Sequence, residues 1–208
     1  MNTTIVGSGM VGSALALAWA GRGHEVTVAV RNPDKPELAD LGRADGVSLV
    51  ALGPDSVAYA DVVVLALTTT AAAEVAISLG GLAGKVVIDP TNPMSGGFGQ
   101  LDYGTTTSSA ERIAEAIPEA RVVKAFNTIG ASFFADPVIG GEAASMFIAG
   151  DDADSKAIVA ELADSLGFDA VDCGPLVESR SLEAMALLWI RMTYVQQAGD
   201  IAFRLIRG

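Results

Sequence analysis

The sequence predicts an α/β fold in which a doubly wound, mainly parallel sheet carries a small helical lobe at its C-terminal end. First, short runs of apolar, mostly β-branched residues (here called bursts) alternate with alanine-rich segments of helical character, as in βαβ units. Second, the bursts are continuous rather than alternating, which is typical of strands buried on both faces. Third, the 208-residue chain is half apolar and contains 23 glycines, which suits one compact unit with a real core.

Eight apolar bursts are the expected strands. They span residues 3–7, 25–30, 47–50, 61–67, 85–89, 121–126, 145–150 and 169–174. The expected helices lie between them, at 10–22, 71–79, 109–117 and 153–166. The strands and helices therefore alternate along most of the chain.

Local signals mark several boundaries. Ser108 and Glu111 have the spacing of a capping box, and Asp151 is an expected cap for the helix after it. Residues 93–109 are rich in Gly, Ser and Thr and predict a long loop of the kind that often carries function. Residues 177–208 have apolar side chains at helical spacing, which predicts one or two helices with a break near Gly199.

Composition excludes several classes of function. The net charge of -12 argues against nucleic-acid and anionic-membrane partners, which need clustered Lys and Arg. One cysteine, Cys173, and one histidine, His24, leave no intramolecular disulfide and no His/Cys metal site, so we expect no metal. The N-terminus lacks a basic leader, and no apolar run reaches the roughly 18 residues of a membrane span. We therefore expect a cytoplasmic protein.

The segment "IVGSGMVG" contains the strongest motif. Gly7, Gly9 and Gly12 have the G-x-G-x-x-G spacing, and they follow a predicted strand and open a predicted helix. Gly7 would allow the tight turn, Gly9 the approach of a pyrophosphate, and Gly12 close packing of helix on strand. The helix N-terminus would offer free N–H groups to the phosphates. This context predicts a dinucleotide site in a Rossmann sheet.

Arg31 decides which dinucleotide is expected. A site that prefers NAD carries Asp or Glu at the end of the second strand, but this strand ends in Val30-Arg31-Asn32. A guanidinium there can pair with a 2′-phosphate and stack on adenine, and Lys35 could add a second charge. Asp34 lies too late to replace the missing acid. The sequence therefore favours NADP(H).

The chain also resembles a known family, the F420-dependent NADP oxidoreductases. The shared segments are "GSGMVGSALA" (7–16), "RNPDK" (31–35), "VVKAFNT" (122–128), "AGDDADSKAIVAEL" (149–162) and "DCGPLVESRSLEAMALLWI" (172–190). The resemblance implies that NADPH lies across the sheet edge and that the deazaflavin coenzyme F420 docks beside the nicotinamide. The cytoplasmic domain of membrane ferric reductases is similar as well.

Together these arguments give a set of expected site residues. The cofactor contacts are expected at Gly7, Ser8, Gly9, Met10, Val11, Gly12, Arg31, Asn32, Lys35, Leu67, Thr68, Thr69, Asn92 and Asn127. The substrate cleft is expected at Pro93, Met94, Asn127, Leu188 and Trp189. Some of these residues could instead have purely structural roles. Asn92 could shape a turn, and Asn127 could cap the next helix. The apolar helix face with Met185, Leu188 and Trp189 could belong to the core.

Other polar residues are expected to be structural. Glu178, Arg180 and Glu183 would form a solvated face held by local ion pairs. Cys173 would be a small buried residue, and His24 a turn residue far from the chemistry. No Lys or His–carboxylate constellation is expected in the cleft, which fits hydride transfer by positioning.

The leading hypothesis is an enzyme that transfers hydride between NADPH and coenzyme F420 as a small-molecule co-substrate. One alternative is reduction of another acceptor, such as a flavin, a metal chelate or a small carbonyl or imine. Another is a non-catalytic NADP-binding sensor. Residues 1–150 would form the NADP-binding domain and 151–208 a βα lobe that completes the cleft. The resemblance implies a homodimer, with Phe203, Leu205 and Ile206 as contact residues.

Overall fold

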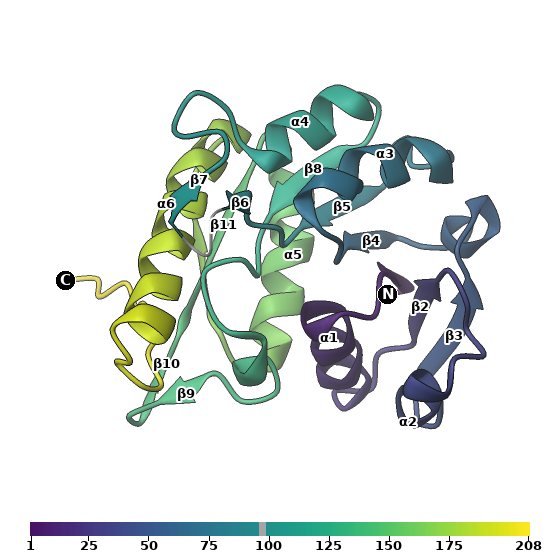
Figure 1. Cartoon of the computed structure of the whole chain (residues 1–208), viewed down its shortest axis with the longest axis horizontal. Helices are drawn as coiled ribbons and strands as arrows, with labels where there is room; N and C mark the ends of the chain where they lie inside the picture. The colour runs from purple at the N-terminus through teal and green to yellow at the C-terminus, as the bar shows by residue number, and fades with distance from the viewer. Residues whose placement is uncertain (96–98) are drawn as a thin grey trace.

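The computed structural model describes residues 1–95 and 99–208, and its main element is one sheet of eight strands (Figure 1). The strand order is β12-β11-β8-β5-β4-β1-β2-β3. The strands are β1 (Thr3–Val6), β2 (Val26–Val30), β3 (Val47–Ala51), β4 (Val62–Leu65), β5 (Val86–Asp89), β8 (Arg121–Lys124), β11 (Ser145–Gly150) and β12 (Asp169–Asp172). Each coincides with one predicted burst.

The sheet is parallel apart from one pair. β11 runs antiparallel to β8, with Ala149 opposite Lys124, and then pairs in parallel with β12. The chain reverses its winding between β1 and β4, which lie side by side at the centre with Thr3 opposite Val62. A doubly wound sheet binds its ligands beyond the carboxyl ends of the strands at such a reversal.

Helices cover both faces of the sheet. They are α1 (Met10–Ala20), α2 (Ala39–Gly42), α3 (Thr69–Leu79), α4 (Ser109–Ala116), α5 (Ala153–Leu166) and α6 (Ser179–Ile190). Side chains of α1, α2 and α5 share one apolar cluster with the strands, and those of α3 and α4 share a second. Figure 1 shows these two groups of helices on opposite sides of the sheet. The α/β, doubly wound architecture is therefore confirmed.

The central strands form because their residues can be buried on both faces. All four residues of β1, β4 and β5 are buried, and Val, Ile and Leu supply most of them. Each such side chain contributes about 1.5–3 kcal/mol when it leaves water completely. This burial fixes the positions at which the strand ends present their polar residues.

The two expected helix caps have different outcomes. Ser108 caps α4 as predicted, because its Oγ accepts from Glu111 N at 3.2 Å. The prediction for α5 was wrong by one residue: Asp152 is the cap, and its Oδ1 accepts from Ser155 N at 2.8 Å. Asp151 instead accepts from Leu176 N at 2.8 Å, so it ties the start of α5 to a later turn.

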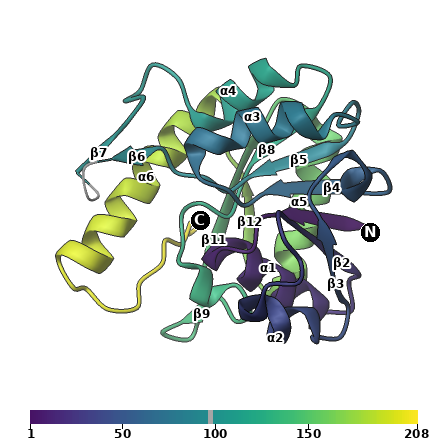
Figure 2. The same ribbon diagram turned by 45° about the vertical axis from the view of Figure 1, so that its right-hand side comes forward.

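The expected long loop 93–109 contains a small hairpin. β6 (Met94–Ser95) pairs with β7 (Gln100–Leu101) in antiparallel fashion, and residues 96–98 lie outside the described part. β7 contacts α6, and Figures 1 and 2 both show the hairpin beside this helix. A second hairpin joins β9 (Val138–Ile139) to β10 (Glu142–Ala143).

The C-terminal segment differs from its prediction. α6 continues as a π-helix over Arg191–Val195, and residues 196–208 then form no helix, so the helical part ends before Gly199. Trp189 Nε1 donates to Ile201 O at 2.7 Å, and Ser145 N donates to Phe203 O at 3.0 Å. These bonds hold the last residues against α6 and β11.

The sheet continues across the expected domain boundary. β12 follows residue 150 and pairs with β11, which precedes it. The division into 1–150 and 151–208 stays a prediction. Among the described residues, no helix is both long and apolar enough to cross a membrane.

Candidate functional site

The turn after β1 needs its first and third glycines for steric reasons. Gly7 has φ +104°, and a Cβ on it would collide with the backbone oxygen of Ala66. A Cβ on Gly12 would collide with Gly7 O and would lie 3.1 Å from Ala66 Cβ. The helix therefore packs directly on its own turn and on the chain after β4, as the motif predicts.

Gly9 is constrained differently. It is the N-cap residue of α1, and a Cβ on it would meet nothing within 4 Å. No side chain caps this helix, and its first turn has no acidic residue. The N-terminal N–H groups of a helix carry partial positive charge and need acceptors. The space in front of Gly9 can therefore receive an anion such as a pyrophosphate.

A cavity of about 860 Å³ lies in front of this turn, along the carboxyl ends of the central strands. The expected cofactor residues that line it are Gly7, Ser8, Gly9, Met10, Val11, Arg31, Asn32, Lys35, Leu67 and Thr68. Additional lining residues are Ala29, Val30, Glu37, Leu38, Leu52, Ala66, Ala71, Val75 and Pro90. Of the expected cofactor residues, Gly12, Thr69, Asn92 and Asn127 are not among the described lining residues.

Two cations stand at one end of the cavity. Arg31 and Lys35 are exposed, and neither side chain has a hydrogen bond or ion pair within the described part of the chain. Asn32 Oδ1 accepts from Asp34 N at 3.1 Å, which shapes the turn between them. Asp34 does not line the cavity, but Glu37 does, and no sequence motif indicates the position of Glu37. This end of the cavity therefore offers the guanidinium of Arg31, the ammonium of Lys35 and the carboxylate of Glu37.

The two expected asparagines bind each other. Asn92 Nδ2 donates to Asn127 O at 2.9 Å, and Asn127 Nδ2 donates to Asn92 Oδ1 at 3.0 Å. Asn127 Nδ2 also donates to Leu182 O of α6 at 3.1 Å. The alternative of Asn127 as a helix cap is wrong, because Gly130 is the N-cap of the next short helix, Ala131–Phe133. Both amides act here as links between loops.

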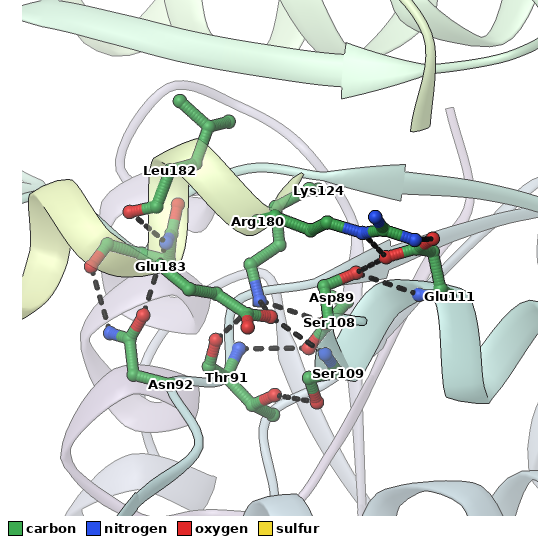
Figure 3. A network of polar contacts seen from close by, with 11 residues as sticks. Asp89, Thr91, Asn92, Ser108, Ser109, Glu111, Lys124, Arg180, Leu182 and Glu183 are labelled. Atoms are coloured by element: carbon green, nitrogen blue, oxygen red, sulfur yellow. Dashed lines mark hydrogen bonds and ion pairs between the residues drawn. The ribbon is translucent and has the colours of Figure 1, made fainter. Parts of the chain in front are cut away.

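A buried ionic cluster, which no sequence motif predicts, lies beside these amides. Lys124 Nζ lies 3.0 Å from Asp89 Oδ2 and 2.8 Å from Glu183 Oε1, and all three side chains are at most 1% exposed. Figure 3 shows the ammonium between the two carboxylates. Burial raises the pKa of Glu183, although Lys124 opposes the shift. The expectation that Glu183 belongs to a solvated face was therefore wrong.

A second ion pair lies nearer the surface. Arg180 donates to both oxygens of Glu111, at 2.9 and 2.6 Å, and so links α6 to α4. The hydrogen bond from Arg180 lowers the pKa of Glu111. The expected ion pair of Arg180 exists, but its partner lies in another helix.

The expected substrate-cleft residues do not line the cavity. Pro93 and Trp189 are buried, Met94 is half-buried in β6, and Leu188 is 52% exposed on α6. A Cβ on Gly130 would lie 2.9 Å from the Trp189 ring, so that ring packs against the loop after β8. For Trp189 the structure supports the alternative of a core residue.

The remaining candidates are not placed for chemistry. His24 lies just before β2, and burial lowers its pKa. Cys173 is half-buried, and burial raises the pKa of its thiol, which disfavours the reactive thiolate. Within the described ranges, no group of three or more His, Cys, Asp and Glu side chains could hold a metal ion.

Comparisons with known proteins agree with this geometry. The family described as NADP oxidoreductase, coenzyme F420-dependent, matches residues 2–93. The F420-dependent NADP reductase of Methanothermobacter thermautotrophicus is 32% identical over 219 residues, which cover 97% of this chain and 92% of that protein. The rat metalloreductase STEAP3 is 32% identical over 88% of this chain, but the chain spans only 36% of its length.

A solved structure gives the same result at the level of the fold. A protein from Arthrobacter sp. FB24, described as a candidate F420-dependent NADP-reductase, superposes with a TM-score of 0.89. It is 34% identical, and the match covers 100% of both chains.

Proposed function

The chain belongs to the family of coenzyme F420-dependent NADP oxidoreductases, and we propose that it transfers hydride between NADPH and the deazaflavin coenzyme F420. The observation that carries the proposal is the continuity of one cavity from the glycine turn to Arg31 and Lys35. A dinucleotide with a 2′-phosphate needs a helix N-terminus for its pyrophosphate and cations for its extra phosphate. Both needs are met in this cavity.

The expected cofactor contacts then take defined roles. Ser8, Gly9 and Met10 would hold the pyrophosphate through backbone N–H groups at the start of α1. Arg31 and Lys35 would bind the 2′-phosphate, because neither cation has a competing partner in the described residues. Leu52, Ala71 and Val75 add apolar surface along the same cavity. The ends of β4 and β5, at Leu67, Thr68 and Pro90, would then lie on the nicotinamide side.

The chemistry follows from this arrangement. NADPH supplies the hydride when it is bound, so the chain need only orient it and keep the acceptor close. The titratable side chains among the described lining residues are Arg31, Lys35 and Glu37, all at the adenosine end. The nicotinamide side therefore offers positioning rather than acid–base catalysis, and we assign no catalytic residue.

The test is reduction of oxidised F420 by the purified protein with NADPH, followed by the deazaflavin absorbance, with NADH as the control. Loss of the band with NADPH and not with NADH is the expected result. Tight NADPH binding without reduction would contradict the deazaflavin assignment. The acceptors to try next would be metal chelates and flavins, then small carbonyls and imines, and failure of all would leave a non-catalytic NADP sensor.

We also propose that the protein is a cytoplasmic homodimer with no nucleic-acid partner. The strongly acidic charge opposes binding to nucleic acid. Leu205 is 41% and Ile206 85% exposed, so both could bury apolar surface against a second copy. Light scattering should give twice the chain mass, and Ile206→Asp should shift the protein towards the monomer. A wild-type monomer at high concentration would contradict the dimer.

A further inference from the structure

The buried cluster around Lys124 occupies the carboxyl ends of two neighbouring strands. Lys124 ends β8 and Asp89 ends β5, and the two residues are register partners. The ammonium has three acceptors: Asp89 Oδ2 at 3.0 Å, Glu183 Oε1 at 2.8 Å and Thr91 O at 2.5 Å. An ammonium has three N–H donors, so Lys124 is fully satisfied by these elements.

The same cluster ties together three segments near the cavity. Thr91 directly follows Pro90, which lines the cavity, and Thr91 N donates to Asp89 Oδ1 at 2.8 Å. Thr91 Oγ1 lies 2.6 Å from the hydroxyl of Ser109, the first residue of α4. Ser109 N donates to the Glu183 oxygen that Lys124 also contacts, at 2.8 Å. Figure 3 shows that the ammonium joins the exit of β5 to α6, and that Thr91 and Glu183, which it contacts, both bond to Ser109 at the start of α4.

Stability alone does not explain such a cluster. Buried charges lose their hydration, and apolar residues of similar volume hold a core equally well or better. Here Glu183 Oε2 is buried without a hydrogen-bond partner among the described residues, which adds a further cost. The cluster instead sets relative position, because hydrogen bonds are directional and each one fixes one segment relative to the others.

We propose that Lys124 is a positioning residue for the nicotinamide end of the site. By holding Thr91 O, it fixes the adjacent Pro90 in the cavity wall, against which the nicotinamide ring would lie, and it fixes α6 relative to that wall. Lys124 itself touches neither NADPH nor the acceptor. This inference rests on the proposed NADP function.

The test compares two ligands that differ only at the nicotinamide. NADPH and 2′-phospho-ADP-ribose share the adenosine, the 2′-phosphate and the pyrophosphate, and only NADPH carries the ring. Their dissociation constants are measured for the wild type and for Lys124→Met, which keeps an unbranched side chain one atom shorter and removes the charge. Arg180→Met is the matched control, because it breaks another α4–α6 link without contacting Thr91.

The expected result is selective. In Lys124→Met the dissociation constant for NADPH should rise about tenfold, and that for 2′-phospho-ADP-ribose should change less than about twofold. Arg180→Met should leave both unchanged. Equal weakening of both ligands would overturn the inference, because a structural defect would act on the whole cavity. An unchanged dissociation constant for NADPH in Lys124→Met would also overturn the inference. The same holds if the wild type binds NADPH and 2′-phospho-ADP-ribose equally tightly.

A folding defect would not end the test. If Lys124→Met does not fold, Asp89→Asn with Lys124→Met removes one charge of each sign, and Glu183 can take up a proton. The same two ligands are then compared. A wild type that binds neither ligand would refute the proposed NADP function itself, whereas a wild type that binds both but lacks the selective loss in the variants refutes only the role of Lys124.

Discussion

Asn127 and Asn92 are bonded to each other in both directions, by one side-chain to side-chain bond of 3.0 Å and one side-chain to backbone bond of 2.9 Å. They follow different strands, β8 and β5, and Asn127 reaches on to Leu182 O in α6. Asn127 is only 4% exposed. The Asn127 amide therefore joins two strand exits and a helix from a buried position.

Asn127→Ala should destabilise the fold. The substitution leaves Asn92 Oδ1 without its protein donor and removes the bond to Leu182 O, so the free energy of unfolding should fall by about 1–3 kcal/mol. Urea denaturation measures the change. Asn32→Ala is the control, because Asn32 is exposed and bonds only within its own turn. Equal losses in the two variants would contradict the argument.

The strands were predictable because each is a short, continuous apolar run, and burial on both faces leaves that signature. The glycine turn was predictable because Gly7 and Gly12 are required by local sterics. The small hairpins and α2 leave no comparable periodicity. For α5, Asp151 and Asp152 are equally good caps in the sequence, and only the structure separates them.

The buried cluster was not predictable for a different reason. Glu183 has the helical setting of a solvated residue, and its partner Lys124 lies 59 positions away. A signal existed at the ends of two strands, where Asp89 and Lys124 each follow an apolar run. Charged residues at adjacent strand ends suggest a pair, but nothing local indicates that a helix closes over them.

Gly12→Ala and Gly9→Ala should separate folding from binding. Alanine suits a helix better than glycine by about 1 kcal/mol. At Gly12 the new Cβ collides with a backbone oxygen, so the free energy of unfolding should still fall by about 1–3 kcal/mol. At Gly9 the Cβ meets nothing, so that variant should lose less than about 1 kcal/mol and yet bind NADPH weakly. Thermal unfolding and NADPH titration test both variants, and normal NADPH binding by Gly9→Ala would contradict the assigned pyrophosphate position.

Arg31→Glu should discriminate between the two nicotinamide coenzymes. Loss of a charge-assisted pair and gain of a repulsive carboxylate should raise the NADPH dissociation constant roughly 100-fold, with little change for NADH. Fluorescence titration with each coenzyme measures this. Arg43→Glu makes the same change of charge at an exposed residue paired with Asp40, outside the cavity. An equal effect on NADPH and NADH, or an equal effect of Arg43→Glu, would mean that the 2′-phosphate lies elsewhere.

Glu183 should make the native state less stable as pH rises. Burial raises its native pKa above the value of 4.5 expected for the unfolded chain, although Lys124 opposes and Asp89 adds to the shift. The protonated form therefore favours folding, and this contribution is complete below pH 4.5 and is lost as pH rises through the native pKa. Urea unfolding across pH should show the wild type losing stability relative to Glu183→Gln in that window.

Glu111 gives the opposite case, because Arg180 lowers its native pKa below 4.5, so its contribution to stability is lost as pH falls. Wild type and Glu111→Gln should diverge with the opposite sign, and the same sign in both comparisons would show that Glu183 is ionised in the native cluster.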